Sequence, residues 1–163
     1  MENPESHWLG PKIGQGIDLN RIRGGNGSSL RQDRSKKLLM ILVIDPTCVA
    51  SQLSVDQMQQ VESRIKQNEI DFALVSFKSK TSVKDVESFA NLAKLNSNSY
   101  SFDGEETDIS PGSQGLQYPA FILTDTNGVI LRIFAGTSES EQIRTRMSDE
   151  IMDDTLREKN RFL

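Results

Sequence analysis

The chain contains a single cysteine, Cys48, at the point where a run of apolar residues gives way to a helical pattern. A cysteine in the first turn of a helix faces unpaired backbone N–H groups and the positive end of the helix dipole, and both stabilise a thiolate. The hydroxyl groups of Thr47 and Ser51 are close enough in sequence to donate a hydrogen bond to this sulfur. Asp45 opposes a negative charge there, and no Lys, Arg or His stands between residues 38 and 61 to offset it. The residues therefore leave two interpretations open: a moderately activated thiol, or a small buried side chain.

Other groups that carry out chemistry are scarce in this sequence. One cysteine cannot form an internal disulfide. The only histidine, His7, lies far from Cys48 and has no ligand cluster around it. We therefore expect no metal site, no cofactor, and no nucleophile of the Cys-His or Ser-His type. The acidic loop at 103–108 lacks the spacing of a calcium loop and is expected to be a solvated surface.

Length and composition restrict the classes of protein to which the chain can belong. The 163 residues, 36% apolar and 26% charged, suit one domain with one core. A net charge of -4 with mixed signs along the chain gives no basic surface for nucleic acid. The longest apolar run, at 38–44, is far shorter than the roughly 20 residues of a membrane span. We therefore expect a soluble chain without a membrane span, and the oligomeric state stays open.

The hydrophobic pattern predicts alternating strands and helices. Strands are expected at 38–44, 70–77 and 99–102, helices at 49–68 and 82–95, a long loop at 103–117, and a hairpin of 120–123 with 129–134. A closing helix is predicted from a capping box of Ser138 and Glu141, with Ile143, Met147 and Ile151 on its inner face. Strands joined through a helix pair in parallel by a right-handed crossover, and a closing hairpin adds antiparallel strands. The prediction is an α/β sandwich with a mixed sheet.

The ends of the chain are expected to differ from its middle. Residues 1–15 are polar with two prolines, which predicts a flexible lead-in. A short strand at 16–22 and a Gly-rich turn at 23–30 predict an N-terminal β-hairpin. The predicted organisation is a lead-in at 1–15, one domain at 16–153 and a C-terminal helical tail at 154–163.

The order of elements and two phrases resemble the thioredoxin fold, and within it the extracytoplasmic thiol-disulfide oxidoreductases and their redoxin relatives. "VIDPTCVAS" resembles the segment in which that group carries a Cys-x-x-Cys pair, with Cys48 on the first cysteine and Ser51 on the second. "GLQYPAFILTDTNGVI" resembles the hairpin after the family's cis-proline, which corresponds to Pro119. The resemblance covers about residues 16–151. It implies a three-layer α/β sandwich with a central mixed sheet and helices on both faces, and an extracytoplasmic location.

The departures from the family pattern decide which activities remain. A dithiol oxidoreductase releases its mixed disulfide by attack of the second cysteine, and Ser51 cannot perform that step. Thr47 also replaces the tryptophan that usually precedes the first cysteine. The first hypothesis is therefore a monothiol redox protein in which Cys48 forms mixed disulfides with a protein or small-molecule thiol or disulfide partner, positioned by Pro119. Whether the chain is an enzyme stays open.

Two alternatives remain. The fold could serve as a redox-inactive binding or scaffold module that docks substrate-like peptides at the edge strand before Pro119. A one-cysteine peroxidase is the weaker alternative, because that group carries Thr or Ser three residues before its cysteine, where this chain has Asp45. The same group uses an arginine from a later strand; Tyr118 stands at that position, and Arg132 lies further along the hairpin.

Overall fold

The computed structural model describes residues 8–110 and 116–161. Its strands are β1 (Ile22–Gly24), β2 (Leu39–Val43), β3 (Asp71–Ser76), β4 (Asn98–Phe102), β5 (Ala120–Thr124) and β6 (Ile130–Ala135). Its helices are α1 (Leu30–Asp33), α2 (Val49–Leu53), α3 (Val55–Gln67), α4 (Val83–Leu92), α5 (Glu106–Ile109) and α6 (Glu141–Arg161), and a 3-10 turn, η2, covers Leu19–Arg21.

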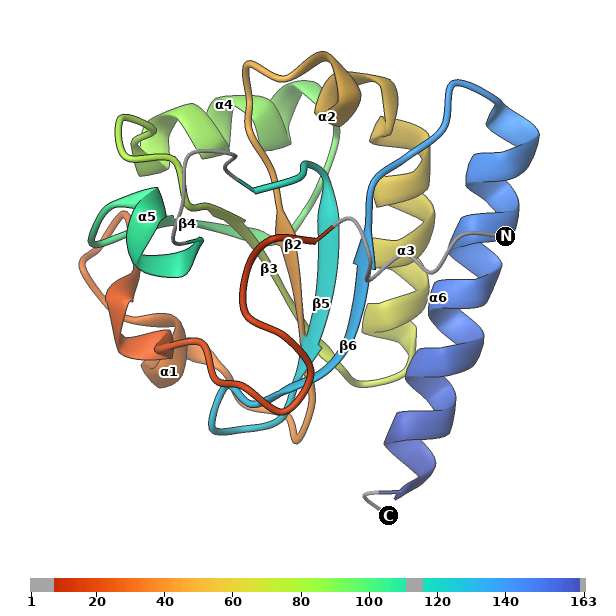
Figure 1. Cartoon of the computed structure of the whole chain (residues 1–163), viewed down its shortest axis with the longest axis horizontal. Helices are drawn as coiled ribbons and strands as arrows, with labels where there is room; N and C mark the ends of the chain where they lie inside the picture. The colour runs from red at the N-terminus through yellow and green to blue at the C-terminus, as the bar shows by residue number, and fades with distance from the viewer. Residues whose placement is uncertain (1–7, 111–115, 162–163) are drawn as a thin grey trace.

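The strands form one mixed sheet in the order β1-β4-β3-β2-β5-β6 (Figure 1). β3 lies parallel to both β2 and β4, whereas β5 runs antiparallel to β2 and β6 antiparallel to β5. All five residues of β2 are buried, because apolar side chains alternate to both faces of this central strand. The mixed sheet, the parallel crossovers and the closing hairpin are confirmed.

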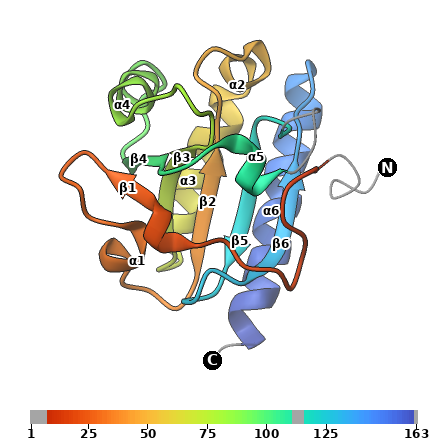
Figure 2. The same ribbon diagram turned by 60° about the vertical axis from the view of Figure 1, so that its left-hand side comes forward.

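Helices cover both faces of the sheet, but unequally. The long helices α3, α4 and α6 pack on one face, where they bury Met58, Phe89 and Ile151 among others. The other face is covered by the N-terminal segment and by the short α1 and α5 (Figure 2). Cys48 packs against the core on this second face.

The N-terminal β-hairpin expected at 16–30 is present only as a single bridge between Arg23 and Ser29. β1 instead pairs along its length with β4. The second arm of the hairpin cannot extend because Ser29 caps α1, and its hydroxyl oxygen accepts a hydrogen bond from the N–H of Gln32.

The predicted lead-in is anchored in its second half. Residues 1–7, which include His7, lie outside the described residues. Trp8 is fully buried and donates from its indole N–H to the carbonyl oxygen of Pro11. Gly14 and Gln15 form backbone hydrogen bonds with Ile130 at the start of β6. The buried indole holds this segment against the core, whereas Leu9 and Ile13 in the same segment are exposed.

Two segments have a helical structure that differs from the prediction. The helix expected at 49–68 is interrupted at Ser54, which separates α2 from α3. The loop expected at 103–117 contains α5, whose capping box joins Glu105 and Asp108. The sequence predicted a solvated loop here because its acidic residues, which include the two capping residues, are also typical of an exposed loop.

α6 is a single helix from Glu141 to Arg161, with no break where a tail was expected to begin. The N–H of Ile143 donates to the hydroxyl of Ser140, so the capping hydroxyl belongs to Ser140 and not to Ser138. Of the three predicted inner residues only Ile151 is buried, and Ile143 is 43% exposed. The buried face consists of Ser148, Ile151, Met152, Thr155 and Glu158. The hydrophobic pattern did not predict this face, because three of its residues are polar; one of them, Glu158, is paired with Arg132.

Within residues 8–110 and 116–161, no helix combines the length and the apolar character needed to cross a bilayer.

The turn of the β5–β6 hairpin provides a test of the fold. Gly128 has φ +83, and a Cβ built on it would lie 2.3 Å from the carbonyl oxygen of Ile17. Gly27 has φ +85 with open space around it. We expect Gly27→Ala to lower the free energy of unfolding by about 1 kcal/mol, because only the backbone is strained. Gly128→Ala should cost at least about 2 kcal/mol more, because the backbone of residue 17 must also move. Urea unfolding of both variants measures the difference, and equal costs would contradict this packing.

Candidate functional site

The candidate site lies at one edge of the sheet, where three segments meet. Val43 at the end of β2 pairs with Ala120 at the start of β5, and on its other side with Val75 near the end of β3. The loop that leads from β2 into α2 and the loop before β5 are therefore neighbours, although more than 70 residues separate Cys48 from Pro119. Figure 1 shows α2 above the end of β2 at this edge.

Cys48 stands at the N-cap position of α2, as the sequence predicted. Its N–H donates to the carbonyl oxygen of Asp45 at 3.0 Å, and its own carbonyl accepts from the N–H of Gln52 at 3.1 Å. The side chain is partly exposed and touches the core beneath it. Because α2 is only five residues long, the helix dipole available to the sulfur is that of little more than one turn.

The hydroxyl groups beside Cys48 have other partners. The Thr47 hydroxyl donates to the Asp45 carboxylate at 2.7 Å, so its one hydrogen is not available to the sulfur. Ser51 is fully buried, and its oxygen accepts from the N–H of Asp45 at 3.4 Å. Both predicted site residues thus stabilise the Asp45 loop. Ser51 keeps its own hydrogen, since it acts as the acceptor in that bond.

Asp45 is a buried carboxylate with its charge compensated. Its second oxygen lies 3.2 Å from the ammonium nitrogen of Lys78, and its first accepts from the backbone N–H of Thr47 at 2.9 Å. Burial works to raise the pKa of Asp45, but the hydrogen bonds from Thr47 and the ammonium group of Lys78 together hold that pKa below its usual value.

The sequence prediction did not include Lys78, because it considered only residues near Cys48. Asp45 lies two residues after β2, and Lys78 lies two residues after β3. Parallel neighbouring strands end at the same edge of a sheet, so these equivalent positions could have predicted the pair.

The loop before β5 brings Pro119 and Tyr118 to the site. The Tyr118–Pro119 peptide bond is cis, as the resemblance implied. Tyr118 is 9% exposed, and its hydroxyl donates to the carboxylate of Glu106 at 2.5 Å. Burial raises the pKa of Tyr118, and the hydrogen bond to the Glu106 carboxylate raises it further. Tyr118 belongs to the hydrophobic core cluster against which Cys48 packs. Glu106 was missed by the sequence because α5 was not expected.

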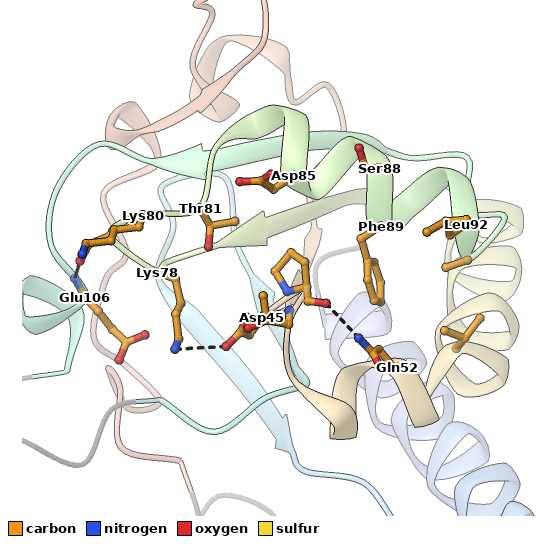
Figure 3. A pocket seen from close by; sticks show the side chains of 15 residues that line it. Asp45, Gln52, Lys78, Lys80, Thr81, Asp85, Ser88, Phe89, Leu92 and Glu106 are labelled. Atoms are coloured by element: carbon orange, nitrogen blue, oxygen red, sulfur yellow. Dashed lines mark hydrogen bonds and ion pairs between the residues drawn. The ribbon is translucent and has the colours of Figure 1, made fainter.

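A cavity of about 880 Å³ opens beside Cys48, between the Asp45 loop and α4 (Figure 3). Its polar end contains Asp45 and Lys78, and its apolar wall contains Val55, Phe89 and Leu92. Cys48 does not line this cavity, but Pro46 and Thr47 immediately before it do. Val49 and Leu53 in the cysteine helix and Leu92 in α4 are also exposed apolar side chains, at 65%, 48% and 87%.

Within residues 8–110 and 116–161, no three His, Cys, Asp or Glu side chains are grouped in a way that could hold a metal ion. The chemistry that the site residues supply is therefore that of one accessible thiol beside a charge-compensated carboxylate and a proline loop.

Comparison with known proteins identifies the fold. No family model matches the sequence, and no curated protein matches it either. Among solved structures, the chain is similar to a protein described as the thiol:disulfide interchange protein DsbE from Chlorobium tepidum, at 16% identity and a TM-score of 0.61. The match covers 87% of this chain and 98% of that one.

Two further structures represent the range of the matches. A protein described as a protein disulfide isomerase from Bacteroides thetaiotaomicron matches at 17% identity and a TM-score of 0.60, with 88% and 91% of the two chains covered. A mutant of PrxQ from Xylella fastidiosa matches at 13% identity and a TM-score of 0.61, with 91% and 97% covered. At these identities the likeness establishes the fold alone, and the fold is thioredoxin-like.

The Asp45 network predicts how stability depends on pH. The folded-state pKa of Asp45 is lowered, so its contribution is fully present above the ordinary pKa of 3.8 and is lost as the pH falls through the folded pKa. Asp45→Asn should cost about 1 to 3 kcal/mol at pH 7, because Lys78 and Thr47 lose a charged acceptor. It should also flatten the loss of stability between about pH 5 and pH 2. Urea unfolding across this range provides the measurement.

Asp149→Asn is the matched control for this experiment, because Asp149 is an exposed carboxylate that pairs with Arg64. It should leave the acid dependence almost unchanged. An acid profile of Asp45→Asn that is identical to that of the native chain would contradict the role given to the buried carboxylate.

Proposed function

We propose that this chain of thioredoxin-like fold is a monothiol redox protein that forms mixed disulfides through Cys48. The observation that carries the proposal is a partly exposed cysteine at a helix N-cap, next to the Tyr118–Pro119 loop, with a buried serine three residues later. A cysteine kept only for packing has no need of exposure at a helix start.

The proposed reaction balances with an external thiol. The Cys48 thiolate attacks one sulfur of a disulfide partner, a new S–S bond forms, and the other half of the partner leaves as a thiolate. Ser51 cannot attack the adduct, because an alkoxide is not available from an ordinary serine at neutral pH. A second thiol from outside the chain then attacks the adduct and restores Cys48. The adduct should therefore be long-lived until such a thiol arrives.

The surface around Cys48 favours a protein as one partner. Val49, Leu53 and Leu92 are apolar side chains with exposed fractions of 65%, 48% and 87%. An apolar surface next to a nucleophile suits a peptide segment better than a small hydrophilic thiol, because its burial on contact is favourable by about 25 cal/mol per Å². Whether a small thiol serves as the external reductant is a separate question.

The same apolar surface favours a second candidate function, a binding module that does not use its thiol. The two candidates differ in what Cys48→Ala does. For a binding module, partner retention is unchanged by this substitution, whereas a monothiol protein loses covalent capture of the partner and keeps at most a weak non-covalent contact.

The contacts of Arg132 argue against peroxide reduction as the function. Its guanidinium lies 2.9 Å from the carboxylate of Glu158 in α6, which packs on the face of the sheet opposite the core that Cys48 touches. An arginine that is committed there does not polarise a peroxide bound at Cys48.

Substitution of Ser51 tests the proposed function directly. With excess 5,5′-dithiobis(2-nitrobenzoate), the folded native chain should release one equivalent of thionitrobenzoate and stop at the Cys48 adduct. Ser51→Cys places a second sulfur three residues along the first turn of the helix, where side chains are neighbours. This variant should release a second equivalent as the internal disulfide closes. Absorbance of the released thiolate and the intact mass measure both steps.

Cys48→Ala is the control, and it should release nothing. A folded native chain whose cysteine reacts more than about a hundredfold more slowly than in the urea-unfolded chain would contradict a monothiol function. That result would leave the binding module as the better account.

A further inference from the structure

We propose that Arg144 is a positioning residue that holds the cysteine helix α2 in register with the Pro119 loop. The inference rests on the proposed function, because the reaction that it would affect is that of Cys48. Arg144 lies in the first turn of α6, far from Cys48 in sequence, and nothing in the sequence pattern distinguishes it from the other arginines of this helix.

α2 has little packing of its own. Only Ser51 among its residues is buried, whereas Val49 and Leu53 are largely exposed. At Ser54 the helix ends and α3 begins, with the Ser54 hydroxyl donating to the carbonyl oxygen of Ala50 at 2.6 Å. A five-residue helix of this kind is not stable alone. Its orientation therefore depends on what holds its two ends, which are the Asp45 loop before it and the junction at Ser54 after it.

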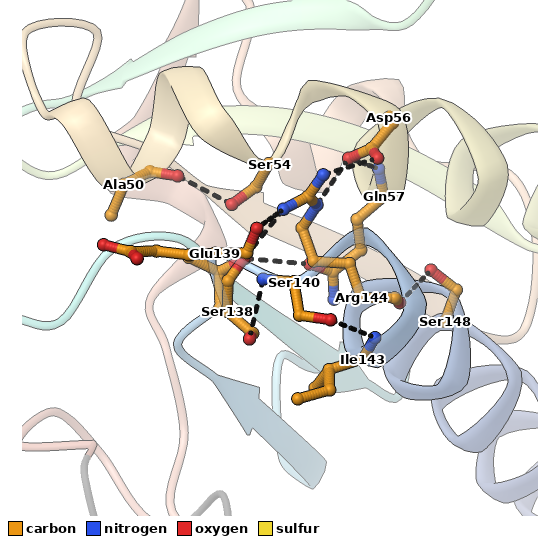
Figure 4. Close-up of polar contacts among 11 residues, drawn as sticks. Ala50, Ser54, Asp56, Gln57, Ser138, Glu139, Ser140, Ile143, Arg144 and Ser148 are labelled. Carbon is orange, nitrogen blue, oxygen red and sulfur yellow. Dashed lines mark hydrogen bonds and ion pairs between the residues drawn. The ribbon is translucent and has the colours of Figure 1, made fainter.

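Arg144 binds this junction in a bidentate manner (Figure 4). Its Nε lies 2.9 Å from one carboxylate oxygen of Asp56, and its Nη2 lies 3.0 Å from the other. Asp56 is in the first turn of α3, two residues after Ser54. The Arg144 side chain is only 12% exposed, so this ion pair is better shielded than an ordinary surface pair. The hydrogen bonds from Arg144 lower the pKa of Asp56 despite its partial burial.

The same guanidinium also holds the loop between β6 and α6. Its Nη1 donates to the carbonyl oxygens of Ser138 at 2.9 Å and Glu139 at 3.1 Å (Figure 4). In the same loop, the Thr137 hydroxyl donates to the side-chain oxygen of Gln57 at 3.3 Å. The Arg144 side chain thus joins the start of α3 to residues 138 and 139, and a lysine cannot reproduce this planar fork.

The loop in turn is bonded to the proline. The N–H of Gly136 donates to the carbonyl oxygen of Pro119 at 2.8 Å, and Ala135 pairs with Ala120 in the sheet. Hydrogen bonds and short stretches of backbone therefore connect α2, through Ser54, Asp56 and Arg144, to the Pro119 loop. Both sides of the site that a peptide disulfide would contact are fixed to one guanidinium.

A second ion pair between the same two helices provides a matched control. Arg64 of α3 lies 2.8 Å from Asp149 of α6, and their side chains are 41% and 60% exposed. This pair joins α3 to α6 without contacting the junction at Ser54 or the loop at 136–139. Loss of an α3–α6 ion pair can thus be separated from loss of the contacts that Arg144 makes.

The test compares two reactions of Cys48 in the full chain. The first is attack on a chromogenic mixed disulfide between thionitrobenzoate and a heptapeptide with apolar residues flanking its cysteine. The second is alkylation by iodoacetamide, which needs no docking beside Pro119. In Arg144→Met and Arg144→Lys, the ratio of the peptide rate constant to the alkylation rate constant should fall roughly tenfold, since a small misplacement of reacting groups is costly. In Arg64→Met the ratio should stay within about twofold of the native value.

Asp56→Asn should lower the ratio as Arg144→Met does, and the double variant should be no worse than either single one, because both changes break the same contact. Urea unfolding identifies variants that fail to fold. If Arg144→Met is one of them, the single variants Arg144→Lys and Asp56→Asn provide the comparison with the native chain. A native chain that does not react with the peptide disulfide would overturn the proposed function. A native chain that reacts, with a ratio unchanged in the folded Arg144 variants, would overturn the positioning role alone.

Discussion

The pairing of β2 with β3 on one side and β5 on the other is the constraint on which the rest of the structure depends. β2 is buried on both faces, so its register is fixed by apolar contacts above and below the sheet. That register alone places the loop after β2 next to the end of β3 and the start of β5. Asp45, Lys78, Cys48 and Pro119 are brought together by this one strand, although no two of them are adjacent in sequence.

Burial of Asp45 has consequences for the whole loop. A carboxylate that is 5% exposed is costly unless its charge and its oxygens are satisfied, and here Lys78 and Thr47 satisfy them. The loop between β2 and α2 is thereby held in one shape, with Cys48 at its end. The contacts of Asp45 therefore position the thiol, and the Lys78 ammonium offsets much of the repulsion that a lone carboxylate would exert on a negative sulfur.

The predictable parts of the molecule were those in which a single segment carries the signal. The apolar strands, the cysteine at a helix start and the proline before β5 could be found in this way, because each depends on residues within a few positions. The break at Ser54 and the helix α5 depend on hydroxyl and carboxylate caps that a hydrophobic pattern does not register. The buried face of α6 was missed because Glu158 and Thr155 are buried there, and Glu158 needs Arg132 from another element. The roles of Lys78, Glu106 and Arg144 likewise depend on partners that are distant in sequence.

Ser51 connects the chemistry of the site to its architecture. Its oxygen accepts the N–H of Asp45 inside the protein, where an unsatisfied backbone donor would be costly. Sulfur is a weak hydrogen-bond acceptor, so a cysteine at this position would satisfy that donor less well. The serine therefore stabilises the loop that positions Cys48 and, in the same place, removes the sulfur that would release a mixed disulfide. In the proposed monothiol reaction, this arrangement holds the thiol in a fixed loop, and another molecule must complete the exchange.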